Sequence, residues 1–446
     1  MLAIQKQKTV FLILFIIIIF SLSLSGNFRI DFPDSNIKEG SNRFRFGIIP
    51  ALAYDSDLGL RYGAVINIFD YKGLSYGKSI YNQYLFLRFT NTTSGSLQIQ
   101  GLLESRTIID NSVTLIEASY LSGKNYDFYG FNGLSAIYQP LFTDNSSSLF
   151  RNRFFYAYDR TLLRLRFDNQ MYIGDGGLRL LTGITFNMYD TGSAGNPEEE
   201  ADNDIYGRTL YDNYIEWGII REDEKNGGIV NLLALGFVYD TRNDLCYCTD
   251  GIWAEAVLLY SPGLIGKNRF TQLVLTYRHH ASTRNDRLTF SFRVSSQQNL
   301  GGTTPFYLLS TYYDSRLSQD GVGGAFNLRG ALRNRIVAEG FMTGSLETKV
   351  KLADFYLFRQ DFFISASLFY DNALVTQVYD TDHGAIIPES TAGLFFINDR
   401  QKLHHTFGVG AYIVFNKDNV ISINYGVPLD RQNGPGGFYV GSSLLF

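Results

Sequence analysis

Long stretches of this sequence alternate between apolar and polar residues with a period of two. In residues 362–371, for example, Ile364 and Leu368 occupy one parity, whereas Ser365 and Ser367 occupy the other. Successive side chains of a β-strand point to opposite faces, so each such stretch predicts a strand with one apolar and one polar face. A chain that repeats this pattern from end to end is restricted to all-β folds.

Many of these stretches run for ten or more residues, which is long enough to cross a bilayer at a tilt. Strands can span lipid only as a closed barrel, because every backbone group must then be paired. We therefore predict an all-β, membrane-spanning antiparallel β-barrel, with its polar parity lining the lumen; a soluble β-sandwich or secreted β protein is the alternative. Sixteen strands are expected, at residues 46–55, 58–70, 81–90, 95–106, 112–121, 152–172, 177–190, 228–241, 250–261, 269–281, 286–298, 340–353, 361–375, 403–415, 419–428 and 436–446.

Two segments leave the strand count open. Residues 152–172 are long enough to contain a hairpin, and residues 210–221 can be read as an additional strand. The predicted connections alternate in length, which is typical of outer-membrane barrels with short turns on one side and long loops on the other. Connections 56–57, 175–176 and 416–418 are short, whereas 122–151, 191–227, 299–339 and 376–402 are long.

The start of the chain predicts export. Residues 1–26 combine Lys6 and Lys8, an apolar run and a small-residue exit, as a secretory signal peptide does. The alternative, an N-terminal membrane anchor, is disfavoured because the unbroken apolar run is shorter than the roughly 20 residues that a helical span needs. Residues 27–45 are then expected to be a short periplasmic linker, and residues 46–446 the barrel.

Composition agrees with an exported β protein. The chain has 30 Tyr, 36 Phe and 43 Gly but only 9 Pro, and no helical period is evident after the signal. The formal net charge of −4 gives no indication of nucleic-acid binding. Outer-membrane lipid is the expected surrounding, and the expected location is the outer membrane.

Metal, cofactor and catalytic chemistry are not expected. Cys246 and Cys248 have no nearby partner ligands, and a bridge between them would be strained, so free thiols or a labile bridge in a turn are expected. The histidines fall mainly in adjacent pairs, which point to opposite faces of a strand and cannot chelate one metal. No motif supports a hydrolase.

The last strand carries alternating apolar residues and ends on an aromatic residue. Phe438, Val440, Leu444 and Phe446 share one parity. Such a terminal strand looks like the signal by which outer-membrane barrels are recognised for insertion. The barrel assembly machinery is therefore an expected partner during the chain's own insertion.

Four motifs resemble the BamA/TamA superfamily, the bacterial surface-antigen family of insertases and translocases. They are residues 238–243 (Val-Tyr-Asp-Thr-Arg-Asn), 260–266 (Tyr-Ser-Pro-Gly-Leu-Ile-Gly), 327–330 (Asn-Leu-Arg-Gly) and 369–373 (Phe-Tyr-Asp-Asn-Ala). The resemblance covers roughly residues 46–446 and is best in the C-terminal half. It implies a sixteen-stranded barrel whose sixth extracellular loop, here near 299–339, folds into the lumen. The first of these motifs is expected to shape a short periplasmic turn.

Two family motifs are matched in part. The tip of the infolded loop reads Val-Arg-Gly-Phe/Tyr in the family, and Arg329 and Gly330 match while Ala331 replaces the aromatic residue. The wall motif Phe-x-Asp-x-Gly keeps Phe369 and Asp371, with alanine at 373.

A lumenal lock follows from the parity of the strands together with this resemblance. Asp371 and Glu347 share the parity of polar neighbours, so both are expected to face the lumen. An arginine donates in a planar fork that suits carboxylates, and Gly330 would allow a tight tip. We predict that Arg329 pairs with Glu347 and Asp371 and holds the loop inward; the alternative is a surface-loop arginine beside ordinary lumen-lining acids.

Three functions remain open from the sequence. The first is a superfamily barrel that assists insertion or translocation of client proteins, opening between its first and last strands and using a periplasmic partner. The second is a passive pore or structural barrel, because residues 27–45 are too few for a POTRA domain and two motif positions differ. The third is a surface receptor or adhesin that acts through loops such as 191–227, whose acidic run at 198–200 is most simply a solvated surface.

Overall fold

The computed structural model describes the barrel, its connections and the infolded loop. The described residues are 44–50, 53–55, 59–71, 81–195, 208–244, 246–357, 360–381, 389–397, 402–415 and 419–441. The predicted signal peptide and residues 27–43 of the predicted linker therefore lie outside the described residues, as do Leu444 and Phe446. The last two positions of the predicted linker belong to β1, so the barrel begins two residues earlier than predicted.

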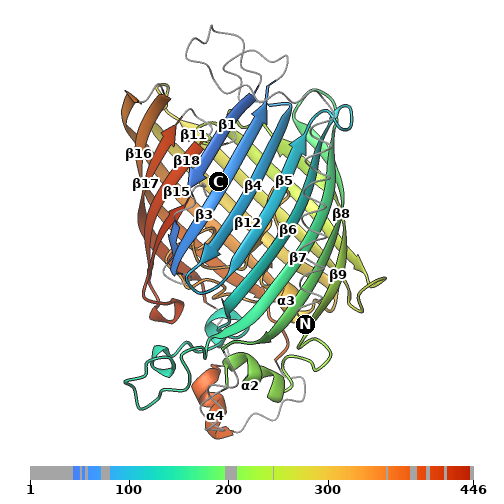
Figure 1. Ribbon diagram of the computed structural model, residues 1–446, viewed down its shortest axis with the longest axis vertical. Coiled ribbons are helices and arrows are strands. Elements are labelled where there is room, and N and C mark those ends of the chain that lie inside the picture. Colours follow the sequence, from blue (N-terminus) through green and yellow to red (C-terminus); the bar gives the residue numbers. More distant parts are fainter. Residues whose placement is uncertain are drawn as a thin grey trace.

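The described strands form one antiparallel sheet that is wound into a barrel (Figure 1). Each alternating stretch of sequence corresponds to a strand, and consecutive strands pair along the chain. The strands are β1 (Phe44–Pro50), β2 (Ala53–Asp55), β3 (Gly59–Asp70), β4 (Gln83–Thr92), β5 (Leu97–Ser105), β6 (Ser112–Asp127), β7 (Ala157–Tyr172), β8 (Leu178–Ser193), β9 (Gly227–Asp240), β10 (Gly251–Pro262), β11 (Arg269–Ser282), β12 (Leu288–Gly302), β15 (Gly340–Leu357), β16 (Gln360–Gln377), β17 (His404–Phe415), β18 (Asn419–Pro428) and β19 (Gly437–Gly441).

The strand count of sixteen is confirmed once β1 and β2 are treated as one interrupted strand. Both pair with β3: β1 pairs with residues 64–70, the C-terminal half of β3, and β2 pairs with residues 59–61 at its start. The barrel closes where β19 meets β2, with Tyr439 opposite Asp55. Within the described residues, this is the one ladder pair that joins the last strand to the first.

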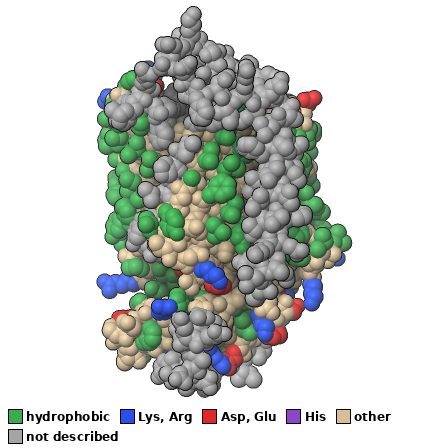
Figure 2. Space-filling model, viewed as in Figure 1, with side chains coloured by type: hydrophobic (Ala, Val, Ile, Leu, Met, Phe, Trp, Pro, Cys, Tyr) green, Lys and Arg blue, Asp and Glu red, His purple; other side chains and the backbone are tan. Residues whose placement is uncertain are grey.

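The two faces of the strands differ as the alternation predicts. On β16, the Leu368 side chain is 67% exposed on the outer face, whereas Asp371 is fully buried on the inner face. Figure 2 shows apolar side chains spread over the sides of the barrel, while charged side chains gather mainly at the lower end. The apolar outer band is the surface that a strand barrel presents to lipid. No helix among the described residues is long and apolar enough to span a membrane.

Long connections gather at the lower end of Figure 1 and form an aromatic cap. They carry helices η1 (Gly133–Ser135), η2 (Pro140–Phe142), α2 (Leu210–Glu216), α3 (Phe306–Leu309) and α4 (Glu389–Phe395). Their rings pack into one buried cluster; Tyr214, for example, contacts Phe128, Phe131 and Trp217. The cluster also includes inward side chains of the barrel strands, such as Leu162 of β7 and Phe270 of β11, so the cap and the barrel mouth share one hydrophobic core.

One strand boundary is wrong, and one open alternative is excluded. Residues 152–156 precede β7, and 153–156 form turns rather than strand. Residues 210–216 form α2 rather than an additional strand, because Thr209 and Asp212 make a reciprocal capping box at its N-terminus.

Candidate functional site: a loop anchored in the lumen

The connection between β12 and β15 folds into the barrel, as predicted. It carries α3 and a small hairpin of β13 (Thr311–Tyr312) and β14 (Gln319–Asp320). Val322, Leu328 and Arg335 within it are fully buried. We call residues 303–339 the lumenal loop.

The structure brings Arg329 of the lumenal loop together with both predicted carboxylates. Its Nε donates to Asp371 Oδ2 at 2.8 Å, and a terminal nitrogen donates to Asp371 Oδ1 at 3.0 Å. The other terminal nitrogen donates to Glu347 Oε2 at 3.3 Å. The backbone N–H of Arg329 also donates to Asp371 Oδ2, at 3.1 Å. The fork is thus bidentate on Asp371, the geometry that arginine–carboxylate pairs favour.

Neighbouring side chains hold the two carboxylates in place. Ser345 Oγ donates to Asp371 Oδ1 at 2.5 Å, and the Tyr412 hydroxyl donates to Glu347. Ser345 and Glu347 lie on β15, Asp371 on β16 and Tyr412 on β17, so three adjacent strands contribute. Their inward parity places all these polar groups on the lumen wall.

Phe369 completes the arginine site. The Arg329 guanidinium lies 3.5 Å from the centre of the Phe369 ring. A Cβ at Gly408 of β17 would lie 2.1 Å from that ring, so the glycine leaves the space that the ring occupies. The wall motif therefore supplies both a carboxylate and a stacking surface for the arginine. Burial lowers the pKa of Arg329, but Asp371 and Glu347 raise it more, so the group stays charged.

Gly330 seats the loop tip against the last strands of the barrel. Its φ of 99° favours glycine, and an added Cβ would lie 2.4 Å from the carbonyl carbon of Gly426 on β18. The Gly330 N–H donates to the Tyr439 hydroxyl on β19 at 3.1 Å. The lock residues thus touch the strand that closes the barrel on β2.

The two alanines that stand where this sequence differs from the family motifs are both buried. Ala331 and Ala373 are 1% and 0% exposed and belong to one apolar cluster with Val322 and Leu328. The small residues are packed within the loop and wall rather than left facing a void.

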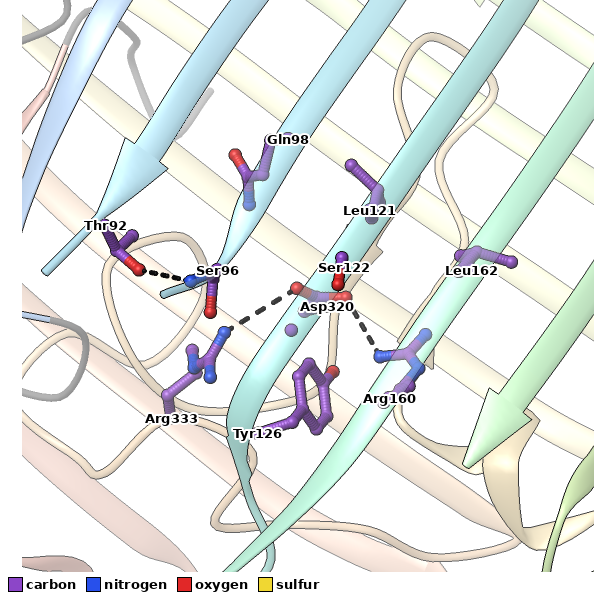
Figure 3. A pocket seen from close by; sticks show the side chains of 11 residues that line it. Thr92, Ser96, Gln98, Leu121, Ser122, Tyr126, Arg160, Leu162, Asp320 and Arg333 are labelled. Carbon is purple, nitrogen blue, oxygen red and sulfur yellow. Dashed lines mark hydrogen bonds and ion pairs between the residues drawn. The ribbon is translucent and has the colours of Figure 1, made fainter. Parts of the chain in front are cut away.

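A second anchor holds the lumenal loop to the opposite part of the wall (Figure 3). Asp320 on β14 pairs with Arg160 of β7 at 3.2 Å and lies 3.9 Å from Arg333. Arg333 also pairs with Asp127 of β6 at 2.6 Å. Asp320, Arg160 and Arg333 line a small cavity together with Tyr126. Burial raises the pKa of Asp320, but Arg160 and Arg333 lower it more.

A third anchor holds the tip of the small hairpin. Asp314, between β13 and β14, pairs with Arg278 of β11. Arg166 of β7 donates to the carbonyl oxygens of Asp314 and Ser315 at 3.0 and 2.9 Å. The pKa of Asp314 is about 2: burial raises it, but Arg278 lowers it more.

Arg335 ties the lumenal loop to the aromatic cap. Its guanidinium donates to the carbonyl oxygens of Gly133, Ala136 and Gln432, at 2.9, 2.7 and 2.7 Å. One buried side chain therefore joins three separate connections. The lumenal loop is anchored to the wall at three places and to the cap at a fourth.

Sequence reasoning identified the first of these anchors and missed the others. The sequence does contain evidence for the other wall anchors: Arg160, Arg166 and Arg278 lie on predicted strands at positions whose parity points into the lumen. Buried basic residues require partners, so an inward arginine predicts an acid or carbonyl on the loop. Which loop residue it meets is not encoded locally.

The remaining predicted site residues lie at the end of the chain. Phe438 is 40% exposed on the outer face and Val440 is half-buried, as their shared parity predicts. Cys246 and Cys248 are free thiols in the connection between β9 and β10. Within the described ranges, no three His, Cys, Asp or Glu side chains are grouped to hold a metal ion.

Comparisons with known proteins agree on the fold. No family model matches the sequence, and no curated protein matches it significantly. Among solved structures, BamA from Haemophilus ducreyi lacking POTRA domains 1–3 is similar, with a TM-score of 0.52 and 16% identity over 90% of this chain and 70% of that one. CdiB from Escherichia coli is similar with a TM-score of 0.53 and 10% identity, over 89% of this chain and 63% of that one.

The chain therefore spans less than two thirds of the CdiB chain that it matches. At these identities the likeness concerns the fold, which is that of a BamA/TamA-like outer-membrane β-barrel.

Proposed function

We propose that this protein resides in the outer membrane and assists the insertion or translocation of client polypeptides. The observation that carries the proposal is the seat of the loop tip. Arg329 is bound to the wall, while Gly330 contacts β18 and β19 next to the seam with β2. Loss of the Arg329 contacts would therefore also disturb the contact between the loop tip and β19, the strand that closes the barrel.

The mechanism that we infer is release of the loop followed by opening of the seam. With the lock engaged, β19 is held by ladder pairs to β18 and by the Tyr439 hydroxyl on the loop tip. Release would leave β2 and β19 as free strand edges. An unpaired edge is a template for an incoming strand, because its N–H and C=O groups can pair with the client backbone.

The proposed arrangement includes the untested ends of the chain. Residues 1–26 would be removed on export, and residues 27–43 would link the barrel to the periplasm, where a partner protein could deliver clients. The barrel assembly machinery would insert the chain through its C-terminal strand. The proposal includes no catalytic step and no cofactor.

A passive open pore is disfavoured by the filled lumen. The lumenal loop contributes buried side chains from Phe306 to Ala338, and its anchors reach β6, β7, β11, β15 and β16. A wide aqueous channel would instead leave the inward polar groups facing water.

Depletion of the protein in its native host tests the proposal. We expect the amounts of other outer-membrane proteins, or of a surface-exposed client, to fall, and expression of the wild type to restore them. Arg329→Ala should restore them poorly, whereas Arg284→Ala in the exposed β11–β12 turn should restore them fully. Unchanged abundance of every outer-membrane and surface protein after depletion would contradict the insertion and translocation role.

A further inference from the structure

The connection between β9 and β10 does not project away from the barrel as a short turn. Residues 241–244 and 246–250 lie at the end of the barrel opposite the aromatic cap, and two of them are buried. Tyr247 is 8% exposed and Cys248 is 4% exposed. Tyr247 packs in one apolar cluster with Tyr412, Val414 and Val420, which line the inner face of β17 and β18. The expectation of an ordinary short turn here is therefore wrong, and we call residues 241–250 the inner hairpin.

The inner hairpin is held in a defined shape by its own polar side chains. Asn243 Oδ1 accepts hydrogen bonds from the backbone N–H groups of Thr249 and Asp250, at 3.1 and 3.2 Å. Asp244 Oδ1 accepts from the N–H groups of Cys246 and Tyr247, at 2.8 and 3.0 Å. Such side-chain bonds to nearby N–H groups fix turns locally. The hairpin is therefore a preformed element.

Its base is fixed to the wall from which it starts. Arg242 donates from Nε to Asp240 Oδ1 at 3.0 Å and lies 4.5 Å from the centre of the Trp253 ring. Asp240 also pairs with Arg179 of β8, at 3.2 Å. These contacts direct the hairpin inward across the lumen.

The tip of the inner hairpin is latched to a different part of the wall. The hydroxyl groups of Tyr247 and Ser365 on β16 are hydrogen-bonded at 2.8 Å. The Tyr247 ring meets Phe363 edge to face at 4.9 Å, and Lys349 Nζ of β15 lies 4.9 Å from its centre. A hairpin that leaves the wall at β9 and β10 thus reaches β15 and β16, over the inner faces of β11 and β12.

The inner hairpin and the Arg329 lock share one side chain of the wall. Tyr412 belongs to the cluster around Tyr247, and its hydroxyl donates to Glu347 of the Arg329 lock. The inner hairpin and the Arg329 lock therefore lie against the same part of the lumen wall.

We propose that the inner hairpin is a second plug, which closes the periplasmic mouth in series with the lumenal loop and is latched by Tyr247. Two obstructions in series must both move before the lumen can pass a solute or an extended chain. The latch combines the Tyr247–Ser365 hydrogen bond with packing of the Tyr247 ring on the wall, and the hairpin keeps its own shape through its internal hydrogen bonds. It can therefore swing out as a unit without unfolding the barrel. This concerns closure of the lumen and does not depend on which client, if any, the protein handles.

The two native cysteines provide a direct probe, because the chain has no others and both flank Tyr247. In a Cys246→Ser background, the rate at which a maleimide labels Cys248 in refolded protein reports release of the hairpin. Wild-type Tyr247 should protect Cys248, and Tyr247→Ala should raise the labelling rate roughly tenfold or more. Tyr425→Ala, on the outer face of β18, is the matched control and should leave the rate unchanged.

A second variant separates release from misfolding. Ser365→Ala removes one hydroxyl from the wall and leaves the hairpin sequence intact, so it should raise the labelling rate less than Tyr247→Ala does. Heat-modifiable gel migration must show that each variant is a folded barrel. Equal labelling of Cys248 in wild type, Ser365→Ala and Tyr247→Ala folded barrels would overturn the latch.

Conductance in planar bilayers tests the series arrangement. We expect Tyr247→Ala and Arg329→Ala each to raise conductance modestly, because the other plug remains. The double variant should raise it by more than the sum of the two single increases. A double variant that conducts no more than Arg329→Ala alone would show that the inner hairpin is not an obstruction, and would leave the lock and the proposed client role untouched.

Discussion

Replacement of Arg329 by alanine should loosen the lumenal loop while leaving the barrel closed by its strand ladders. The side chain donates three hydrogen bonds, two to Asp371 and one to Glu347. All three side chains are at most 1% exposed, so no water can replace the guanidinium without rearrangement. The substitution leaves two buried carboxylates without their cation.

The size of the effect follows from that burial. Removal of one partner from a buried ion pair costs about 3–5 kcal/mol. The lower part of this range is expected, because Asp371 keeps hydrogen bonds from Ser345 Oγ and from the backbone N–H of residue 329. Since about 1.4 kcal/mol corresponds to a factor of ten, the population with the loop released should rise roughly a hundredfold to a thousandfold.

Hydrogen–deuterium exchange of the refolded protein measures this population. Amides of residues 322–335 should exchange faster in Arg329→Ala, whereas the amides of β7 and β8 should not change. Arg329→Lys should fall between wild type and alanine, because lysine keeps the charge but loses the fork and the stacking on Phe369. Arg284→Ala, in an exposed turn, serves as the control.

A rescue experiment tests the electrostatic cause. If uncompensated charge drives release, then Glu347→Gln in the Arg329→Ala background should slow the exchange again, because one buried charge is removed. Identical exchange of the lumenal loop in Arg329→Ala, Arg284→Ala and wild type would refute the reasoning, and Arg329 would then be a structurally incidental contact.

Three further predictions concern the other contacts of the lumenal loop. Gly330→Ala should release the tip at a cost of about 1–3 kcal/mol, because the residue has φ of 99° and its Cβ would press on Gly426; Gly176→Ala, with open space around it, should be neutral by the same exchange measurement. Asp320→Asn should speed loop exchange less than Arg329→Ala does, because the Asp320 side chain is 29% exposed and Arg333 keeps Asp127. Acid should weaken the Asp314 anchor, which faces Arg278, Arg166 and Glu255. Its folded pKa of about 2 lies below the unfolded value of about 3.9, so the stabilisation is present above pH ~4 and is lost as the pH falls through about 2. The fluorescence of Trp253 in a Trp217→Phe background should report this transition, and Asp314→Asn should abolish it.

The barrel was predictable from sequence because the polarity of each strand residue indicates which face of the sheet it occupies. Lipid and lumen impose opposite polarities on neighbouring positions, so Leu368 and Asp371 reveal their faces without any tertiary information. The Arg329 contacts were predictable because a parity argument placed two carboxylates inward and the Arg-Gly tip supplied a matching cation. In both cases a short segment contains the relevant signal.

The missed features depend on pairings between distant segments. Asp320 meets Arg160 across 160 positions of the chain, and no periodicity indicates such a pair. The inner hairpin was read as an ordinary turn because its motif lies between two strands, and only the wall opposite shows what Tyr247 contacts. Helix α2 was ambiguous because its aromatic residues suit a strand equally well, while the capping box that decides the matter spans four residues.

Apolar and ionic contacts have different roles in holding the lumenal loop. The cap is joined by an aromatic cluster, whose opening would expose a large apolar surface to water. The lumenal loop shares this cluster through Phe306, Tyr307 and Leu332. Its middle part is held to the wall by apolar packing against Phe341, Ala373 and Val375, and by ion pairs to Asp127, Arg160, Arg278, Glu347 and Asp371. A buried ion pair gains little over a hydrophobic contact, because desolvation offsets most of the attraction, but it does fix one register of loop on wall. The apolar contacts of the lumenal loop therefore supply buried area, whereas its ion pairs set the register of the loop on the wall.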